Sequence, residues 1–103
     1  MILIGVNELH GFFKKHAQSK SALVAWSKIV SESHYANFNQ LRKTFPSADY
    51  VYHTYTIFNI AGNKYRLVTM INYDVQVIII KHIWTHAEYD MLKNKNILRR
   101  GGL

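Results

Sequence analysis

The sequence predicts a single α+β domain in which a helical hairpin packs on one face of a mostly antiparallel sheet. The 103 residues suffice for one compact domain and no more. Apolar residues recur at helical spacing in the first part of the chain, whereas short runs rich in β-branched and aromatic residues alternate with turn signals in the second. The expected order of elements is β-α-α-β-β-β-α.

The first half of the chain supplies a short strand and two helices. Residues 1–4 are apolar and predict a strand, and residues 6–17 carry apolar side chains at helical spacing. A second amphipathic helix ends near Ser33, and the short polar link before it favours an αα-hairpin. Residues 34–54 are less regular, and we expect one helical turn at 41–45.

The second half predicts three strands joined by tight turns. The strands cover residues 55–60, 64–72 and 75–84. Turn signals separate them at 61–63 and at 73–74.

A short helix is expected directly after the last strand. Thr85 and Glu88 have the spacing of a capping box, and Trp84 can pack on Tyr89 as a hydrophobic staple. From about residue 93 to 103 the chain is basic, and we expect it to form a flexible tail.

Composition narrows the classes of function. Thirteen Lys and Arg against six Asp and Glu give a net charge of +7, which suits nucleic acid or an acidic protein as partner. Cysteine is absent and the histidines lack the spacing of a zinc pair, so we expect no metal and no cofactor. The longest apolar run is far below the ~20 residues that span a bilayer, and the first residues do not predict a signal peptide. We therefore expect a cytoplasmic protein without a membrane partner.

Cations on the last two strands suggest an anion site. A loop of two or four residues at 73–74 places Arg66 directly opposite Lys81, with Lys64 on the same face, and places His82 on the other face under the helices. Like charges directly opposite destabilise a sheet by about 0.2–1 kcal/mol. The face is therefore either an anion site or a solvated surface with splayed side chains, and a three-residue turn would remove the pairing.

The same residues include the kinds of chemical group that RNA cleavage requires. Without a metal, that reaction needs a base for the ribose 2′-hydroxyl, cations for the charged phosphorane and an acid for the leaving 5′-oxygen. Arg66, Lys81 and Lys64 fit the cationic role. His86 and Tyr89 are available as base and acid in either assignment, while a purely structural cap is the alternative explanation of His86.

Two segments of the chain resemble the HigB family of RelE-like toxins. They are F-N-I-A-G-N-K-Y-R-L-V (58–68) and K-H-I-W-T-H-A-E-Y-D (81–90), and L-R-K-T-F-P-S-A-D (41–49) also fits the family pattern. The resemblance implies the RelE-like fold and a ribosome-dependent mRNA endonuclease that acts as the toxin of a type II toxin–antitoxin system and inhibits translation. It implies a HigA-type helix-turn-helix antitoxin and the translating ribosome, with its mRNA and ribosomal RNA, as partners. Operator DNA would be contacted only through the antitoxin.

The resemblance also indicates functional positions. We expect catalytic roles for Arg66, Lys81, His86 and Tyr89. We expect RNA contacts from a wider polar and basic set, namely Arg42, Lys43, Asn63, Lys64, Lys93, Lys95, Arg99 and Arg100. The alternative function is a non-catalytic basic module that binds RNA or protein on the same scaffold.

Overall fold

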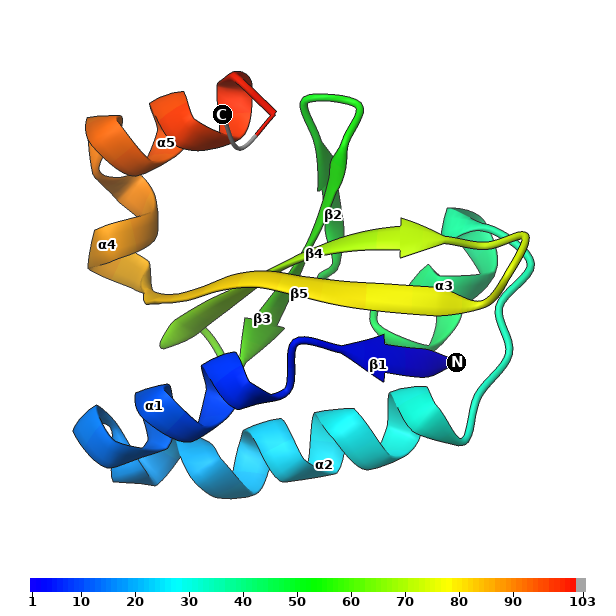
Figure 1. Ribbon diagram of the computed structural model, residues 1–103, viewed down its shortest axis with the longest axis horizontal. Coiled ribbons are helices and arrows are strands. Elements are labelled where there is room, and N and C mark those ends of the chain that lie inside the picture. The colour runs from blue at the N-terminus through cyan, green and yellow to red at the C-terminus, as the bar shows by residue number, and fades with distance from the viewer. Residues whose placement is uncertain (102–103) are drawn as a thin grey trace.

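The computed structural model describes residues 1–101 as one five-stranded sheet with helices on both of its faces (Figure 1). The strand order is β1-β5-β4-β3-β2. The elements are β1 (Ile2–Ile4), α1 (Asn7–Lys15), η1 (Ala17–Ser19), α2 (Lys20–Ser31), α3 (Phe38–Thr44), β2 (Asp49–Val51), β3 (Tyr55–Ile60), β4 (Tyr65–Asn72), β5 (Val77–Thr85), α4 (His86–Asp90) and α5 (Leu92–Arg99). The predicted α+β class and mostly antiparallel sheet are confirmed. Over the described residues no helix is long and apolar enough to cross a membrane.

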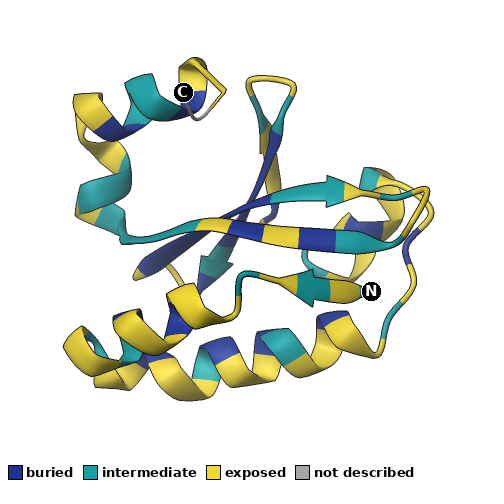
Figure 2. Cartoon of the chain, viewed as in Figure 1, coloured by how far each residue is buried: buried dark blue, intermediate teal, exposed yellow. Residues whose placement is uncertain are grey.

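The predicted helical hairpin, α1 and α2, packs on one face of the sheet. Its apolar side chains, among them Leu9 and Leu23, meet Leu67 from β4 and Ile78 from β5, and all four are almost completely buried. Figure 2 shows the buried stripes of both helices turned toward the strands. This cluster is the main core, and burial of its apolar surface is the principal stabilising contribution.

The first strand pairs with the last one, in parallel. Ile2 is the partner of Val77, and Ile4 is the partner of Ile79. Gly5 then turns the chain toward α1 with a φ of +95°, and a Cβ at this position would lie 2.8 Å from the carbonyl oxygen of Ile80. Both the left-handed backbone and this close approach require glycine.

Helix α3 and strand β2 were absent from the predicted order. Helix α3 begins at Phe38 and is capped by Asn37, whose Oδ1 accepts a hydrogen bond of 3.0 Å from the N–H of Gln40, so the expected helical turn is a longer helix. Strand β2 adds an antiparallel edge to β3, with Asp49 opposite Ile57.

The expected flexible tail is instead helix α5 over most of its length. Leu98 is completely buried against Tyr55, Ile57 and Val68, on the face of the sheet away from the hairpin. The side chain of Asn94 is also buried, and its Nδ2 donates to the carbonyl of Glu88 over 2.7 Å. Packing of these two side chains therefore orders the basic segment up to Arg99, whereas residues 102–103 lie outside the described part of the chain.

The predicted pairing of Arg66 with Lys81 is wrong. The turn between β4 and β5 covers residues 73–76, so it is centred one residue later than the expected loop at 73–74. A β-bulge at Lys81 shifts the register further, so that Arg66 lies opposite Trp84. The bulge also reverses the alternation of side chains after Lys81. His82 consequently lies opposite Val68, on the face away from the hairpin rather than under it.

Candidate active site

The joint between β5 and α4 is fixed by the predicted capping box. The N–H of Thr85 donates to Oε1 of Glu88 over 2.8 Å, and the N–H of Glu88 donates to Oγ1 of Thr85 over 3.1 Å. Trp84 and Tyr89 flank the box with ring centroids 6.5 Å apart, as expected for the staple. This joint sets the direction in which α4 presents its side chains.

His86 is the first residue of α4 and contacts both the turn before β4 and the rest of its own helix. Its N–H donates to the carbonyl of Lys64 over 2.9 Å. Its Nε2 lies 3.2 Å from Oδ2 of Asp90, and both side chains are about half exposed, at 45% and 56%. Asp90 was not among the predicted site residues, although its spacing of four from His86 would have indicated this contact.

Arg66 brings a buried positive charge to the same place. Only 8% of the residue is exposed. Its Nη2 donates to Oδ1 of Asn63 over 2.5 Å, and its Nη1 donates to the carbonyl of Asn63 over 3.2 Å. The guanidinium Cζ lies 6.0 Å from the centroid of the Tyr89 ring. The turn before β4 therefore orients the cation toward α4.

The environment of Tyr89 keeps its hydroxyl protonated. Burial is the main cause that raises the pKa of Tyr89, and the negative charge of Asp49 adds to it. The guanidinium of Arg66 acts in the opposite direction but does not outweigh burial. The ammonium of Lys95 lies 5.1 Å from the centroid of the ring and 3.8 Å from Oδ1 of Asp90. At neutral pH this phenol can donate a proton.

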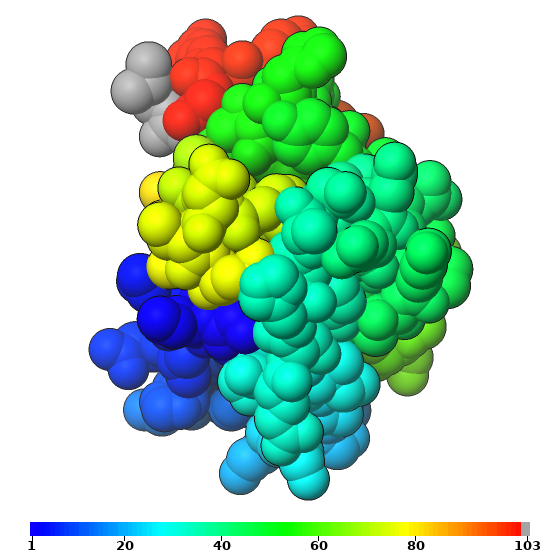
Figure 3. All heavy atoms as spheres, turned by 90° about the vertical axis from the view of Figure 1, so that its right-hand side faces the viewer, coloured from blue at the N-terminus to red at the C-terminus, as the bar shows by residue number. Residues whose placement is uncertain are grey.

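The predicted basic residues divide between this cluster and other surfaces. Lys95 joins it through its ammonium, and Lys64 borders it through the backbone carbonyl that accepts from His86. Lys93, Arg99 and Arg100 lie on or next to α5. Helix α3, with Arg42 and Lys43, lies at the end of the sheet away from α4 and faces the viewer in Figure 3.

The side chain of Arg42 also has local contacts of its own. Its Nη2 donates to the carbonyl of Pro46 over 3.2 Å, and its Cζ lies 5.9 Å from the centroid of the Phe38 ring. Arg42 and Lys43 are therefore not brought together with Arg66 and His86.

Lys81 is also separate from the cluster. It is exposed in the β5 bulge, three positions before Trp84, so it lies roughly 10 Å along the strand from the point opposite Arg66. Its charge acts on His82, whose pKa is lowered first by burial and then by Lys81. The bulge therefore separates Lys81 from Arg66 and Lys64, which were expected beside it.

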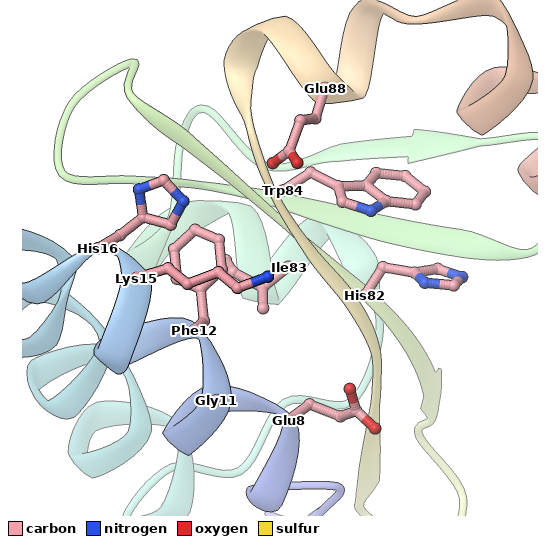
Figure 4. Close-up of a pocket in the computed structure, with 9 residues that line it drawn as sticks. All are labelled: Glu8, Gly11, Phe12, Lys15, His16, His82, Ile83, Trp84 and Glu88. Atoms are coloured by element: carbon pink, nitrogen blue, oxygen red, sulfur yellow. The ribbon is translucent and has the colours of Figure 1, made fainter.

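A groove between α1 and β5 lies beside the cluster (Figure 4). Its volume is about 370 Å³. The residues that line it come from both elements and from α4: Glu8, Gly11, Phe12, Lys15, His16, His82, Ile83, Trp84 and Glu88. Prediction from sequence missed the groove because it depends on how α1 lies against the part of β5 that β1 does not cover.

Within residues 1–101, no three His, Asp or Glu side chains come together in the manner of a metal site. The groups that the structure brings together in the cluster are an imidazole next to a carboxylate, a protonated phenol, a guanidinium and one ammonium group.

The fold and this cluster define a small basic α+β domain in which an imidazole–carboxylate contact and a phenol lie on one short helix beside a buried guanidinium. The family model of the HigB toxin, described as the RelE-like toxic component of a toxin–antitoxin system, matches residues 19–92. The mRNA interferase toxin HigB of Escherichia coli is 33% identical, over 87% of this chain and 88% of that protein. The mRNA interferase HigB of Shigella flexneri gives the same values, and that of a second Escherichia coli strain is 28% identical over 77% of this chain and 79% of that protein. The chain belongs to the HigB family of RelE-like toxins, and an antitoxin is therefore its expected partner.

Proposed function

We propose that this protein is the toxin of a type II toxin–antitoxin system and cuts mRNA on the translating ribosome. Its relatives from Escherichia coli and Shigella flexneri are named mRNA interferases. The observation that carries the proposal is that the single short helix α4 presents the His86–Asp90 contact and the Tyr89 phenol beside the buried Arg66. These are the three kinds of group that RNA cleavage requires in the absence of a metal.

In the proposed reaction His86 is the general base. Its imidazole takes the proton of a ribose 2′-hydroxyl, and the oxygen then forms a bond to the adjacent phosphorus. Cleavage of the bond from phosphorus to the 5′-oxygen leaves a 2′,3′-cyclic phosphate and a 5′-hydroxyl. The carboxylate of Asp90, 3.2 Å from Nε2, orients the ring and stabilises the imidazolium as it forms.

Tyr89 is the proposed general acid. Because burial raises its pKa, the phenol holds its proton at neutral pH and can pass it to the 5′-oxygen as that atom gains negative charge. This assigns base and acid to two residues that sequence reasoning left interchangeable.

Arg66 and Lys64 are the proposed stabilisers of the phosphorane. Asn63 fixes the guanidinium by two hydrogen bonds, so little reorganisation is needed when charge develops. Burial strengthens the electrostatic effect of Arg66, since the effective dielectric is lower than in water. For Lys81 we propose an RNA contact in place of a catalytic role, because the bulge separates it from Arg66.

The proposed partners follow from the family. We propose a HigA-type helix-turn-helix antitoxin that inhibits the site, and contact with operator DNA only through that antitoxin. The net charge of +7 and the basic residues of α5 would support binding to ribosomal RNA in the cytoplasm.

Inducing the protein and mapping mRNA 5′ ends across the genome tests the proposal. Wild type should arrest growth and generate new 5′ ends, while the double variant Arg66→Ala with His86→Ala should do neither. Lys28→Ala with His34→Ala is the matched control, because both residues are exposed and lie on or next to α2. Urea unfolding establishes that the double variant is folded.

Two results would contradict the proposal. Undiminished cleavage by a folded double variant would show that the site is elsewhere. Growth arrest and ribosome binding without new 5′ ends would favour the non-catalytic RNA- or protein-binding module.

A further inference from the structure

The side chains of His82 and Trp84 stack on each other, and the proposed reaction gives this pair no role. Their ring centroids are 4.6 Å apart and their planes differ by 13°. Trp84 lies directly opposite Arg66, and His82 lies directly opposite Val68. The stacked pair therefore stands on the same face of the sheet as Arg66, one strand away.

The bulge at Lys81 creates this arrangement. Ile78 and Ile80 face the helical hairpin, and in a regular strand His82 and Trp84 would face it too. The extra residue reverses the alternation, so that Ile83 packs on the main core and both rings face the other way. Bulges that re-aim side chains occur frequently next to active sites.

The stacked pair is suited to contact with a flat, uncharged ring. Both side chains are half-buried, so one part of the stack is anchored and another remains accessible. Burial and the nearby charge of Lys81 lower the pKa of His82, although Glu8 acts in the opposite direction. The imidazole is therefore neutral at neutral pH and stacks without a charge of its own.

The groove borders the stack on the side of α1. Its volume of about 370 Å³ falls in the range of roughly 300–1,000 Å³ typical of ligand sites. In Figure 4 the rings of His82 and Trp84 extend in the same direction from β5, away from Phe12 and Lys15, which line the groove from α1. A Cβ at Gly11 would meet no atom within 4 Å, so the groove is open at that point.

We propose that His82 and Trp84 form a platform on which one base of the mRNA stacks, on the face of the sheet that carries Arg66. Aromatic side chains bind unpaired bases of single-stranded RNA in this way, with little dependence on sequence. Lys81, whose charge acts on His82, supplies positive charge for the RNA backbone. The inference rests on the proposed function and adds to it the group that positions the substrate next to Arg66.

The two tryptophans of the chain allow a direct test. The protein is labelled with 5-fluorotryptophan and titrated with a 2′-O-methyl RNA tetranucleotide, which cannot be cleaved because its 2′-hydroxyls are blocked. The fluorine signal of Trp84 should shift saturably, while that of Trp26, which is only 3% exposed in the main core, should stay fixed. An abasic oligonucleotide of the same length should leave both signals unchanged.

Variants at Trp84 test whether the aromatic ring itself binds the base. Trp84→Leu should weaken binding of the tetranucleotide by roughly 10-fold, the loss expected for one stacked base, while Trp84→Phe should retain most of the affinity.

The outcomes distinguish the platform from the function on which it rests. If wild type cleaves mRNA but the Trp84 signal stays fixed up to millimolar tetranucleotide, the platform is wrong and the nuclease stands. Equal affinity of the Trp84→Leu variant and wild type would also overturn the platform. If the Trp84 signal shifts as expected but no new mRNA 5′ ends form, the platform stands and the nuclease is wrong.

Discussion

The guanidinium of Arg66 lies against the ring of Tyr89, with its Cζ 6.0 Å from the ring centroid. Arg66 belongs to β4 and Tyr89 to α4, so the contact joins the two elements that carry the proposed chemistry. The guanidinium favours the charged phenolate, yet burial dominates and raises the pKa of Tyr89. The contact therefore places a cation beside a phenol that still holds its proton.

Tyr89→Phe should distinguish the role of the Tyr89 hydroxyl in cleavage from the role of the ring in packing. The ring contacts with Arg66 and Trp84 remain, so the free energy of unfolding should change by less than about 1 kcal/mol. Loss of the general acid should slow cleavage of ribosome-bound mRNA by roughly 10²–10⁴-fold. Tyr50→Phe, at an exposed tyrosine on β2, is the control and should cleave normally. Normal cleavage by the Tyr89 variant would remove this residue from the reaction.

Thr85→Ala should affect both stability and activity through the capping box. Loss of the hydroxyl that accepts from the N–H of Glu88 should cost about 1 kcal/mol, measured by urea unfolding. Because the box fixes the start of α4, His86 should lose its position and cleavage should fall further than the loss of folded protein explains. Thr85→Ser keeps the hydroxyl, and equal defects in the two variants would argue against the cap as the cause.

Stability should depend on pH through His82. Its pKa is lowered in the folded state, so below the unfolded value of about 6.5 the unfolded chain binds more protons than the folded one. The contribution of His82 is fully present above that value and is lost as the pH falls through the folded pKa. His82→Phe keeps an aromatic ring and should flatten the decline in unfolding free energy between about pH 7 and 5. The same slope in both proteins would contradict this.

Leu98→Ala should destabilise the protein by about 2–5 kcal/mol, because the leucine is completely buried under the second face of the sheet. Arg99→Ala, at the exposed neighbouring position, should stay within about 0.5 kcal/mol of wild type. Chemical denaturation measures both. A negligible cost at Leu98 would mean that the segment after Asp90 is a mobile tail, as its basic composition suggested.

Lys64→Ala and Arg42→Ala should differ in their effects on RNA binding. Lys64 borders His86, so its loss should weaken binding of a single-stranded oligonucleotide and reduce the salt dependence by about 0.7 per phosphate contact removed. Arg42 lies on α3, away from this cluster, and its loss should change neither quantity. Affinity measured at several salt concentrations distinguishes the two, and an equal effect would extend the RNA surface to α3.

Features encoded in adjacent residues could be predicted from the sequence. The capping box needs only Thr85 and Glu88, and the hairpin around Gly62 needs only a short turn signal. The amphipathic spacing of α1 and α2 likewise identifies the face that each helix buries. These signals placed His86 and Tyr89 at a strand end correctly.

The register of β5 depends on contacts between distant residues. Gln76 adopts a φ of 57°, and its Nε2 donates to the carbonyls of Tyr35 and Tyr73 over 2.7 and 2.6 Å. These contacts lengthen the turn beyond the two residues that the local sequence indicates. Prediction therefore paired Arg66 with the wrong residue and placed His82 on the wrong face.

Helix α5 is a second feature that the local sequence does not predict. Only Asn94 and Leu98 are buried in it, and the other side chains are mainly polar or charged. A spacing of four between one polar and one apolar residue is too weak a signal for an amphipathic helix. The packing surface that orders it is formed by strands from earlier in the chain.

The parallel pairing of β1 with β5 has a consequence for how the protein is made. Strand β1 is synthesised first, but it can pair with β5 only after Val77–Ile79 have been synthesised. Strand β4 also depends on β5 for its second neighbour in the sheet. His86 and Tyr89 follow within the next few residues. A nascent chain therefore contains no complete site until β5 has emerged from the exit tunnel. An enzyme proposed to cut messages on ribosomes becomes competent only when most of its own message has been read.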